Sequence, residues 1–118
     1  MMRPVDTGLS IYFYRTPVDF RKAIDGLSAY VQSVMGKDPF DKSLYVFISK
    51  RRNKVKILYY ERCGFVLWYK RLDEEKFHWP NADDNVITLS TQQINWLLDG
   101  FNLNAMTPHA EKRYSYVV

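Results

Sequence analysis

The stretch LYVFISKRRNKVKILYYERCGFVLWYKRL, residues 44–72, sets the architecture. It contains three runs of β-branched and aromatic residues, which are the residues that fit a pleated, half-buried surface. These runs span residues 44–49, 54–60 and 65–72, and the segments 50–53 and 61–64 connect them. A parallel crossover needs a dozen or more residues, so connections this short favour antiparallel neighbours. The stretch therefore predicts a three-stranded antiparallel meander.

The chain before this stretch predicts a strand and a helix. Ile11–Tyr14 is a short β-type run. Thr16 suits a helix cap and Pro17 suits the first helical position, with an acid following in the first turn. Apolar residues then recur at helical spacing, and Gly36 is a suitable stop. The predicted apolar face consists of Phe20, Ile24, Leu27, Val31 and Val34.

The chain after the stretch predicts an edge strand at Val86–Leu89 and a second helix. Ser90 with Gln93 three residues later has the form of a capping box. Ile94, Leu97, Leu98 and Phe101 form an apolar stripe, and Gly100 ends the helix. Residues 102–118 are predicted to be an irregular tail, in which Tyr114–Val118 is a strand candidate.

The expected fold is therefore α+β, with one domain over residues 1–118 and a core over about 9–101. An antiparallel sheet of three to five strands would carry the N-terminal and the C-terminal helix on one face. The 118 residues are 47% hydrophobic, which suits a packed core. The single cysteine, Cys63, excludes an internal disulfide. With no apolar run of signal-peptide or membrane-spanning length, these features predict a cytoplasmic protein.

Positive charge is concentrated in the segment Lys50–Arg71. This segment holds one acid, Glu61, whereas the rest of the chain has nine basic and twelve acidic residues. Lysine and arginine neutralise nucleic-acid phosphates, so the segment is a candidate nucleic-acid-binding region. Its basic residues are Lys50, Arg51, Arg52, Lys54, Lys56, Arg62, Lys70 and Arg71. The alternative interpretation is a polar sheet face that only confers solubility.

Strand periodicity predicts which basic side chains share a face of the sheet. Alternate side chains of a strand point to opposite faces, which puts Lys54 and Lys56 on one face. Lys70 shares its parity with Trp68. Arg21 and Lys22, near the start of the first predicted helix, form a candidate second basic patch. The alternative for Arg21 is a pair with Asp25 one turn further on.

No motif in the sequence predicts catalysis, a metal or a cofactor. His78, His109 and Cys63 are the available soft ligands, and no two of them have a metal-ligand spacing. Phosphate loops and dinucleotide fingerprints are absent. Two acidic clusters, residues 73–75 and 83–84, are contiguous in sequence, so their side chains diverge and are expected on a solvated surface. We therefore expect a protein that is not an enzyme.

A series of short motifs resembles one known family. The chain is similar to the TnpB accessory proteins encoded by the second open reading frame of insertion-sequence-66 elements, which are distinct from the RNA-guided nucleases that share that name. The motifs, in order, are Asp19-Phe20-Arg21-Lys22, Asp25-Gly26-Leu27, Asp38-Pro39-Phe40, Val46-Phe47, Lys56-Ile57-Leu58-Tyr59, Gly64-Phe65, Tyr69-Lys70-Arg71-Leu72 and Phe77-His78-Trp79-Pro80. The resemblance implies an accessory role in bacterial transposition, beside a separate transposase and a second small accessory protein.

Three functional hypotheses follow. The first is a factor that contacts DNA phosphates through the basic segment. The second is an adaptor that docks on the transposase without touching DNA, with Trp68 and Trp79 as candidate interface anchors, because tryptophan is enriched at binding hot spots. For each tryptophan the alternative is core packing. The third is a small metal-dependent nuclease, which would need several converging carboxylates.

Overall fold

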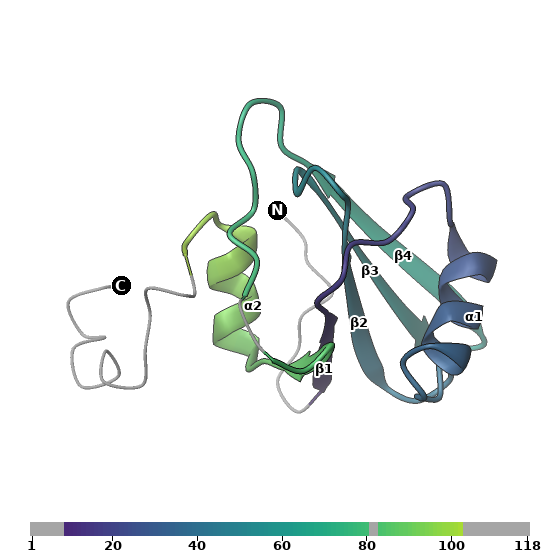
Figure 1. Ribbon diagram of the computed structural model, residues 1–118. Coiled ribbons are helices and arrows are strands. Elements are labelled where there is room, and N and C mark those ends of the chain that lie inside the picture. Colours follow the sequence, from purple (N-terminus) through teal and green to yellow (C-terminus); the bar gives the residue numbers. More distant parts are fainter. Residues whose placement is uncertain (1–8, 81–82, 103–118) are drawn as a thin grey trace.

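The computed structural model describes residues 9–80 and 83–102, which form one five-stranded sheet and two helices (Figure 1). The α+β class and the sheet are confirmed. The strand order across the sheet is β4-β3-β2-β1-β5. The elements are β1 (Ser10–Tyr14), α1 (Ile24–Ser33), β2 (Ser43–Ile48), β3 (Lys54–Glu61), β4 (Gly64–Arg71), β5 (Val86–Thr88) and α2 (Thr91–Leu98).

The predicted meander is confirmed as β2, β3 and β4, each antiparallel to the next. The β3–β4 connection is a two-residue hairpin, in which Glu61 pairs with Gly64. Both turn residues, Arg62 and Cys63, have positive φ values of 45° and 66°. Two successive positive φ values define the type I′ turn, whose twist matches that of the flanking strands. The turn therefore fixes the register of β4 on β3.

The sequence predicted an antiparallel sheet, but one pair of neighbouring strands is parallel. β1 runs parallel to β2, with Ser10 opposite Ser43 and Phe13 opposite Val46. The long connection between these strands contains α1, and a crossover helix is the usual way to join parallel neighbours. β5 then pairs antiparallel with the other side of β1. β1 is thus an interior strand, and β4 and β5 are the two edges.

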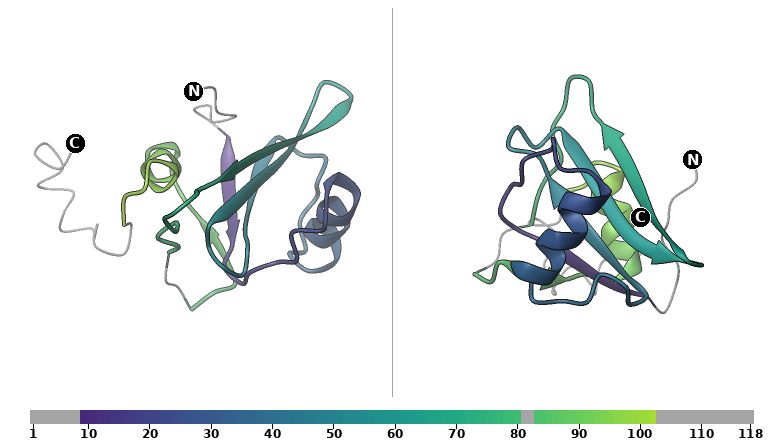
Figure 2. Two further views of the ribbon diagram at one scale, coloured as in Figure 1. Left: turned by 90° about the horizontal axis from the view of Figure 1, so that it is seen from above. Right: turned by 90° about the vertical axis from the view of Figure 1, so that its right-hand side faces the viewer.

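The two helices cover opposite faces of the sheet, which corrects the expectation that both pack on one face (Figures 1 and 2). All six residues of β2 are buried, so neither of its faces is left to solvent. Tyr45 and Phe47 pack with Leu27 and Val31 of α1. The intervening side chains of β2 join a second cluster with Ile94, Trp96, Leu97 and Leu98 of α2. A sheet that is apolar on both faces needs a helix on each.

The helix termini differ in how well local signals predicted them. α2 begins as expected, because Ser90 accepts a hydrogen bond from the Gln93 backbone and the Gln93 side chain accepts one from the Ser90 backbone. α1 begins at Ile24 after Ala23, which makes no side-chain cap, and not at Thr16 as predicted. The N–H of Val18 donates to the carbonyl of Ile48, so long-range pairing holds this segment outside the helix.

Several other features bear on the sequence-based expectations. Val34 is 48% exposed and lies just beyond α1, so it does not complete the predicted apolar face. The strand candidate Tyr114–Val118 lies outside the described residues. No described helix has the combination of length and apolar character that crossing a membrane requires.

Candidate nucleic-acid interface

Three exposed basic residues, Lys50, Arg51 and Arg52, occupy the turn between β2 and β3. The turn closes through hydrogen bonds from the Arg52 N–H to the Ser49 carbonyl (2.9 Å) and from the Ser49 N–H to the Lys54 carbonyl (3.0 Å). Arg52 has φ = 61°, which lies in the left-handed region. The backbone therefore forms a tight turn, and the charged side chains of the turn lie at the end of the sheet.

Two further basic residues lie beside this turn. Lys54 is the first residue of β3 and stands directly opposite Arg71, the last residue of β4. The Arg71 side chain is 60% exposed, and its guanidinium is 3.8 Å from the carboxylate of Asp73, a loose surface pair. We call Lys50, Arg51, Arg52, Lys54 and Arg71 the basic end of the sheet.

The backbone of the basic end is held by the chain that follows β4. The Leu72 N–H donates to the Asn53 carbonyl at 2.8 Å, and the Phe77 N–H donates to the Arg52 carbonyl at 2.7 Å. Phe77 itself is 2% exposed and belongs to the core on the α2 face. The basic end is therefore built on a fixed backbone, which lowers the ordering cost of any contact it makes.

The loop between β1 and α1 passes beside the basic end. An open hollow of about 640 Å³ separates the loop from the β2–β3 turn. It is lined by Pro17–Phe20 on one side and by Ser49, Lys50, Arg51, Asn53 and Lys54 on the other. The structure thus brings the motif Asp19-Phe20-Arg21-Lys22 to the basic turn, although about thirty residues separate them in sequence.

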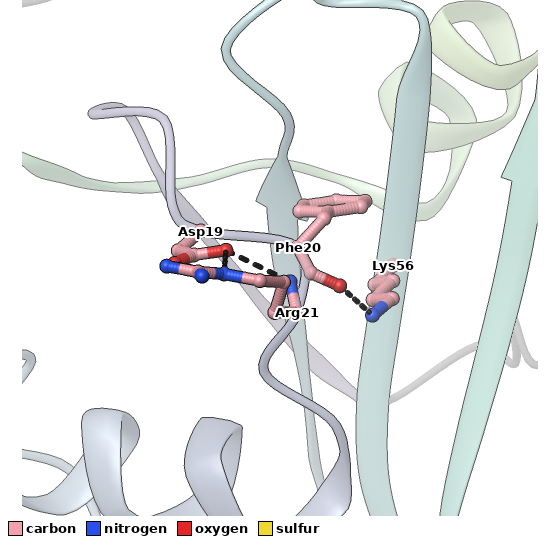
Figure 3. Close-up of polar contacts among 4 residues, drawn as sticks. All are labelled: Asp19, Phe20, Arg21 and Lys56. Carbon is pink, nitrogen blue, oxygen red and sulfur yellow. Dashed lines mark hydrogen bonds and ion pairs between the residues drawn. The ribbon is translucent and has the colours of Figure 1, made fainter.

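Arg21 of the second predicted patch is paired with Asp19 and not with Asp25 (Figure 3). Its Nη2 lies 2.6 Å from Asp19 Oδ2, and its Nε donates to the same carboxylate at 2.9 Å. The hydrogen bonds from the Arg21 side chain and backbone lower the pKa of Asp19 to about 2. The pair is exposed, with 91% of the Arg21 side chain accessible. Lys22 is half-buried, with Nζ 5.9 Å from the centre of the Tyr30 ring.

Lys56 is turned into the fold. Its Nζ donates to the carbonyl of Phe20 at 2.9 Å (Figure 3). It also donates to the carbonyl of Lys22 at 2.8 Å and lies 4.8 Å from the centre of the Phe20 ring. Burial lowers its pKa below the ordinary lysine value, and the nearby charge of Lys54 acts in the same direction. Lys56 thus ties the loop before α1 to the sheet, and its ammonium already has protein partners.

The remaining predicted basic residues lie elsewhere. Lys70 is on the α2 face, where its Nζ donates to the carbonyl of Leu98 at 3.1 Å. A cation at this position also complements the negative end of a helix. Arg62 is exposed in the β3–β4 turn, at the opposite end of the sheet from the β2–β3 turn. The eight basic residues of the predicted segment therefore divide among four locations, and only five of them form the basic end.

The two candidate interface tryptophans belong to the core on the α2 face. Trp79 is 3% exposed and packs 4.9 Å from the ring of Phe13, measured between centroids. Trp68 is half-buried against the same cluster. The large apolar side chains that do reach the surface include Phe40 (60% exposed) and Tyr69 (50%). The motif Asp38-Pro39-Phe40 did not indicate that the Phe40 ring is exposed, because a lone aromatic after a proline in a loop has no periodicity that reveals exposure.

The carboxylates of the described residues do not form the cluster that the nuclease hypothesis needs. Within residues 9–80 and 83–102, no three histidine, cysteine, aspartate or glutamate side chains lie close enough together to hold a metal ion. Asp73, Glu74, Glu75, Asp83 and Asp84 are all exposed, as the sequence analysis expected of a solvated surface. Cys63 is exposed in its turn.

The geometry defines the class of this protein: it is a small α+β domain in which exposed basic residues gather at one end of the sheet. The chain belongs to the family described as IS66 Orf2-like proteins, whose profile matches residues 9–108. Family membership confirms the resemblance seen in the sequence and makes the chain an accessory protein of insertion-sequence transposition.

Two relatives from Sinorhizobium fredii are similar over most of their length. The uncharacterized protein y4jC is 31% identical over 106 residues, which cover 90% of this chain and 91% of the relative. The uncharacterized protein y4hO is 30% identical over 101 residues, covering 86% of this chain and 88% of the relative. No solved structure matches the chain significantly.

Proposed function

We propose that this protein serves transposition by binding DNA through the basic end of the sheet. The observation that supports the proposal is the gathering of Lys50, Arg51 and Arg52, all exposed, with Lys54 and Arg71 on one fixed backbone. Each lysine or arginine that neutralises a phosphate releases condensed counterions, which is the main source of affinity in sequence-independent binding.

The binding mode would be tolerant of sequence. Phosphate contacts position a protein on a duplex, whereas contacts to base edges carry the sequence information. Helix α2 has no basic residue, and its apolar side chains are buried against the sheet. Neither feature suits a helix that reads the major groove. Sequence selection would then come from the transposase or from a second accessory protein of the same element.

The test is binding of the full chain to a labelled duplex from an element end, and to a scrambled duplex, across a salt series. The test variant combines Arg51→Ala with Arg52→Asn, because asparagine tolerates the positive φ at position 52. Each lost phosphate contact removes about 0.9 from the slope of log K against log salt, so the slope should flatten by about two.

A matched control removes the same charge from the opposite end of the sheet. It combines Lys42→Ala with Arg62→Asn, two exposed positions outside the basic end, of which position 62 also has a positive φ. The control should bind like the unmodified protein. Equal losses in both double variants would mean that only net charge matters. No binding at low salt would overturn the proposal and favour the adaptor hypothesis, in which the chain docks on the transposase without touching DNA.

A further inference from the structure

The edge strand β4 has features of a pairing surface. It is eight residues long, without a proline, and β3 is its only neighbour among the described strands. None of its residues is fully buried. In the right-hand view of Figure 2, the strand runs along one margin of the sheet. Natural proteins usually shorten, bend or cover such edges, because an open edge pairs readily with another strand.

The hairpin register shows which backbone groups of β4 point away from the sheet. In a two-residue hairpin the residues flanking the turn, here Glu61 and Gly64, form a hydrogen-bonded pair. Hydrogen-bonded and non-hydrogen-bonded pairs then alternate along the strand. Phe65, Leu67 and Tyr69 fall in the non-hydrogen-bonded positions against β3. Their N–H and C=O groups therefore point outward, to where a further strand would lie.

The side chains of these three residues lie on the α1 face, and the flanking aromatics form two clusters. At one end of β4, Phe65, Tyr60 and Phe40 form a cluster with ring centroids 5.0–5.1 Å apart. At the other end, Tyr69 lies beside Phe20 and the ammonium of Lys56. Each cluster contains one strongly exposed ring, Phe40 at 60% and Tyr69 at 50%.

We propose that β4 pairs antiparallel with β4 of a second copy of this chain, about a two-fold axis at Leu67. In this register Leu67 faces its own counterpart, and Phe65 of each copy faces Tyr69 of the other. The outward backbone groups of all three residues are then paired. The aromatic cluster of one copy meets the exposed Tyr69 of the other, and the symmetry repeats this contact, as a self-complementary interface requires.

The aromatic pairing favours this register over a neighbouring one. Centring on Leu67 overlaps residues 64–70 and leaves Arg71 beyond the last aromatic pair. Centring on Trp68 would place Arg71 opposite Phe65 and would lose the pairing of Phe65 with Tyr69. A strand of another protein would also satisfy the outward backbone groups of β4. Only a second copy of this chain necessarily places a tyrosine opposite Phe65 and a phenylalanine opposite Tyr69. The inference does not depend on DNA binding.

The first measurement is sedimentation equilibrium of the full chain over a wide concentration range. We expect a species of twice the 14.0 kDa chain mass. The second is mild oxidation of Leu67→Cys in a Cys63→Gly background, which removes the only native thiol. A hydrogen-bonded antiparallel pair has Cα atoms about 5.5 Å apart, within the range a disulfide spans.

The control is Arg71→Cys in the same background, at a position on the same strand and the same face. In the proposed register the two copies of residue 71 are eight residues apart along the strands, which corresponds to about 27 Å. Disulfide-linked dimer should form with Leu67→Cys and not with Arg71→Cys, and circular dichroism would verify that both variants are folded. A chain that stays monomeric at all concentrations overturns the proposal. So does a dimer in which the two cysteines cross-link equally or not at all, because its interface would then lie elsewhere.

Discussion

Replacing Lys56 with methionine should destabilise the fold by about 2 kcal/mol. The change keeps the length of the side chain but removes the ammonium that donates to the carbonyls of Phe20 and Lys22. Hydrogen bonds to charged groups contribute about 1.5–3 kcal/mol each. A cation over an aromatic ring adds about 0.5–1 kcal/mol, and the Phe20 ring is 4.8 Å away. Because Lys56 is only half-buried, water replaces part of this stabilisation, and we take roughly half of the sum of the lower values.

Urea unfolding followed by circular dichroism measures the effect. With a urea dependence of about 2 kcal/mol per molar, the midpoint should fall by about 1 M. Lys54→Met is the matched control, because Lys54 lies two residues earlier on the same face of β3 and its ammonium has no hydrogen bond within the described residues. The control should change the free energy of unfolding by less than about 0.5 kcal/mol.

Equal urea midpoints for the two methionine variants would refute this prediction. That result would mean that the carbonyls of Phe20 and Lys22 find water as readily as they find the ammonium. Lys56 would then be an ordinary surface cation, and it would return to the list of residues available for phosphate contact.

Two further predictions concern the turn and the loop. Cys63→Gly should stabilise the protein by about 1 kcal/mol, because Cys63 has φ = 66° and a left-handed conformation costs a non-glycine residue about this much. A urea midpoint for Cys63→Gly that is no higher than that of Cys63→Ala would contradict this prediction. Asp19 should titrate at about pH 2 by carbon NMR, and Arg21→Ala should return its pKa toward 3.8. Because the folded-state pKa is lowered, the pair stabilises the fold above about pH 4, and this contribution is lost as the pH falls toward 2; an unchanged titration in Arg21→Ala would argue against the ion pair.

The features that sequence predicted well are those determined by near neighbours. The meander follows from two short connections, and the start of α2 follows from Ser90 and Gln93, which bond each other within one turn. The family resemblance rested on motifs in order along the chain and needed no knowledge of the fold. The gathering of Lys50, Arg51 and Arg52 was visible for the same reason, because all three occupy one turn.

The features that sequence missed depend on distant residues. Thr16 and Pro17 carry good helix-start signals, but the backbone bond from Val18 to Ile48 overrides them. Periodicity correctly placed Lys56 on the same face as Lys54, but it did not show that this face meets the loop at Phe20 and Lys22. The helices were assigned to one face because an apolar strand such as β2 shows no alternation that would reveal two buried faces.

The interior position of β1 has a consequence for how the chain folds. The hairpins β2–β3 and β3–β4 join residues that are close in sequence, so they can form early at little entropic cost. β1 reaches β2 only when the long segment from Tyr14 to Ser43 closes, and β5 joins the sheet only through β1. We therefore expect the docking of β1 to be the slow step of folding, and until it occurs β5 has no partner strand among the described residues.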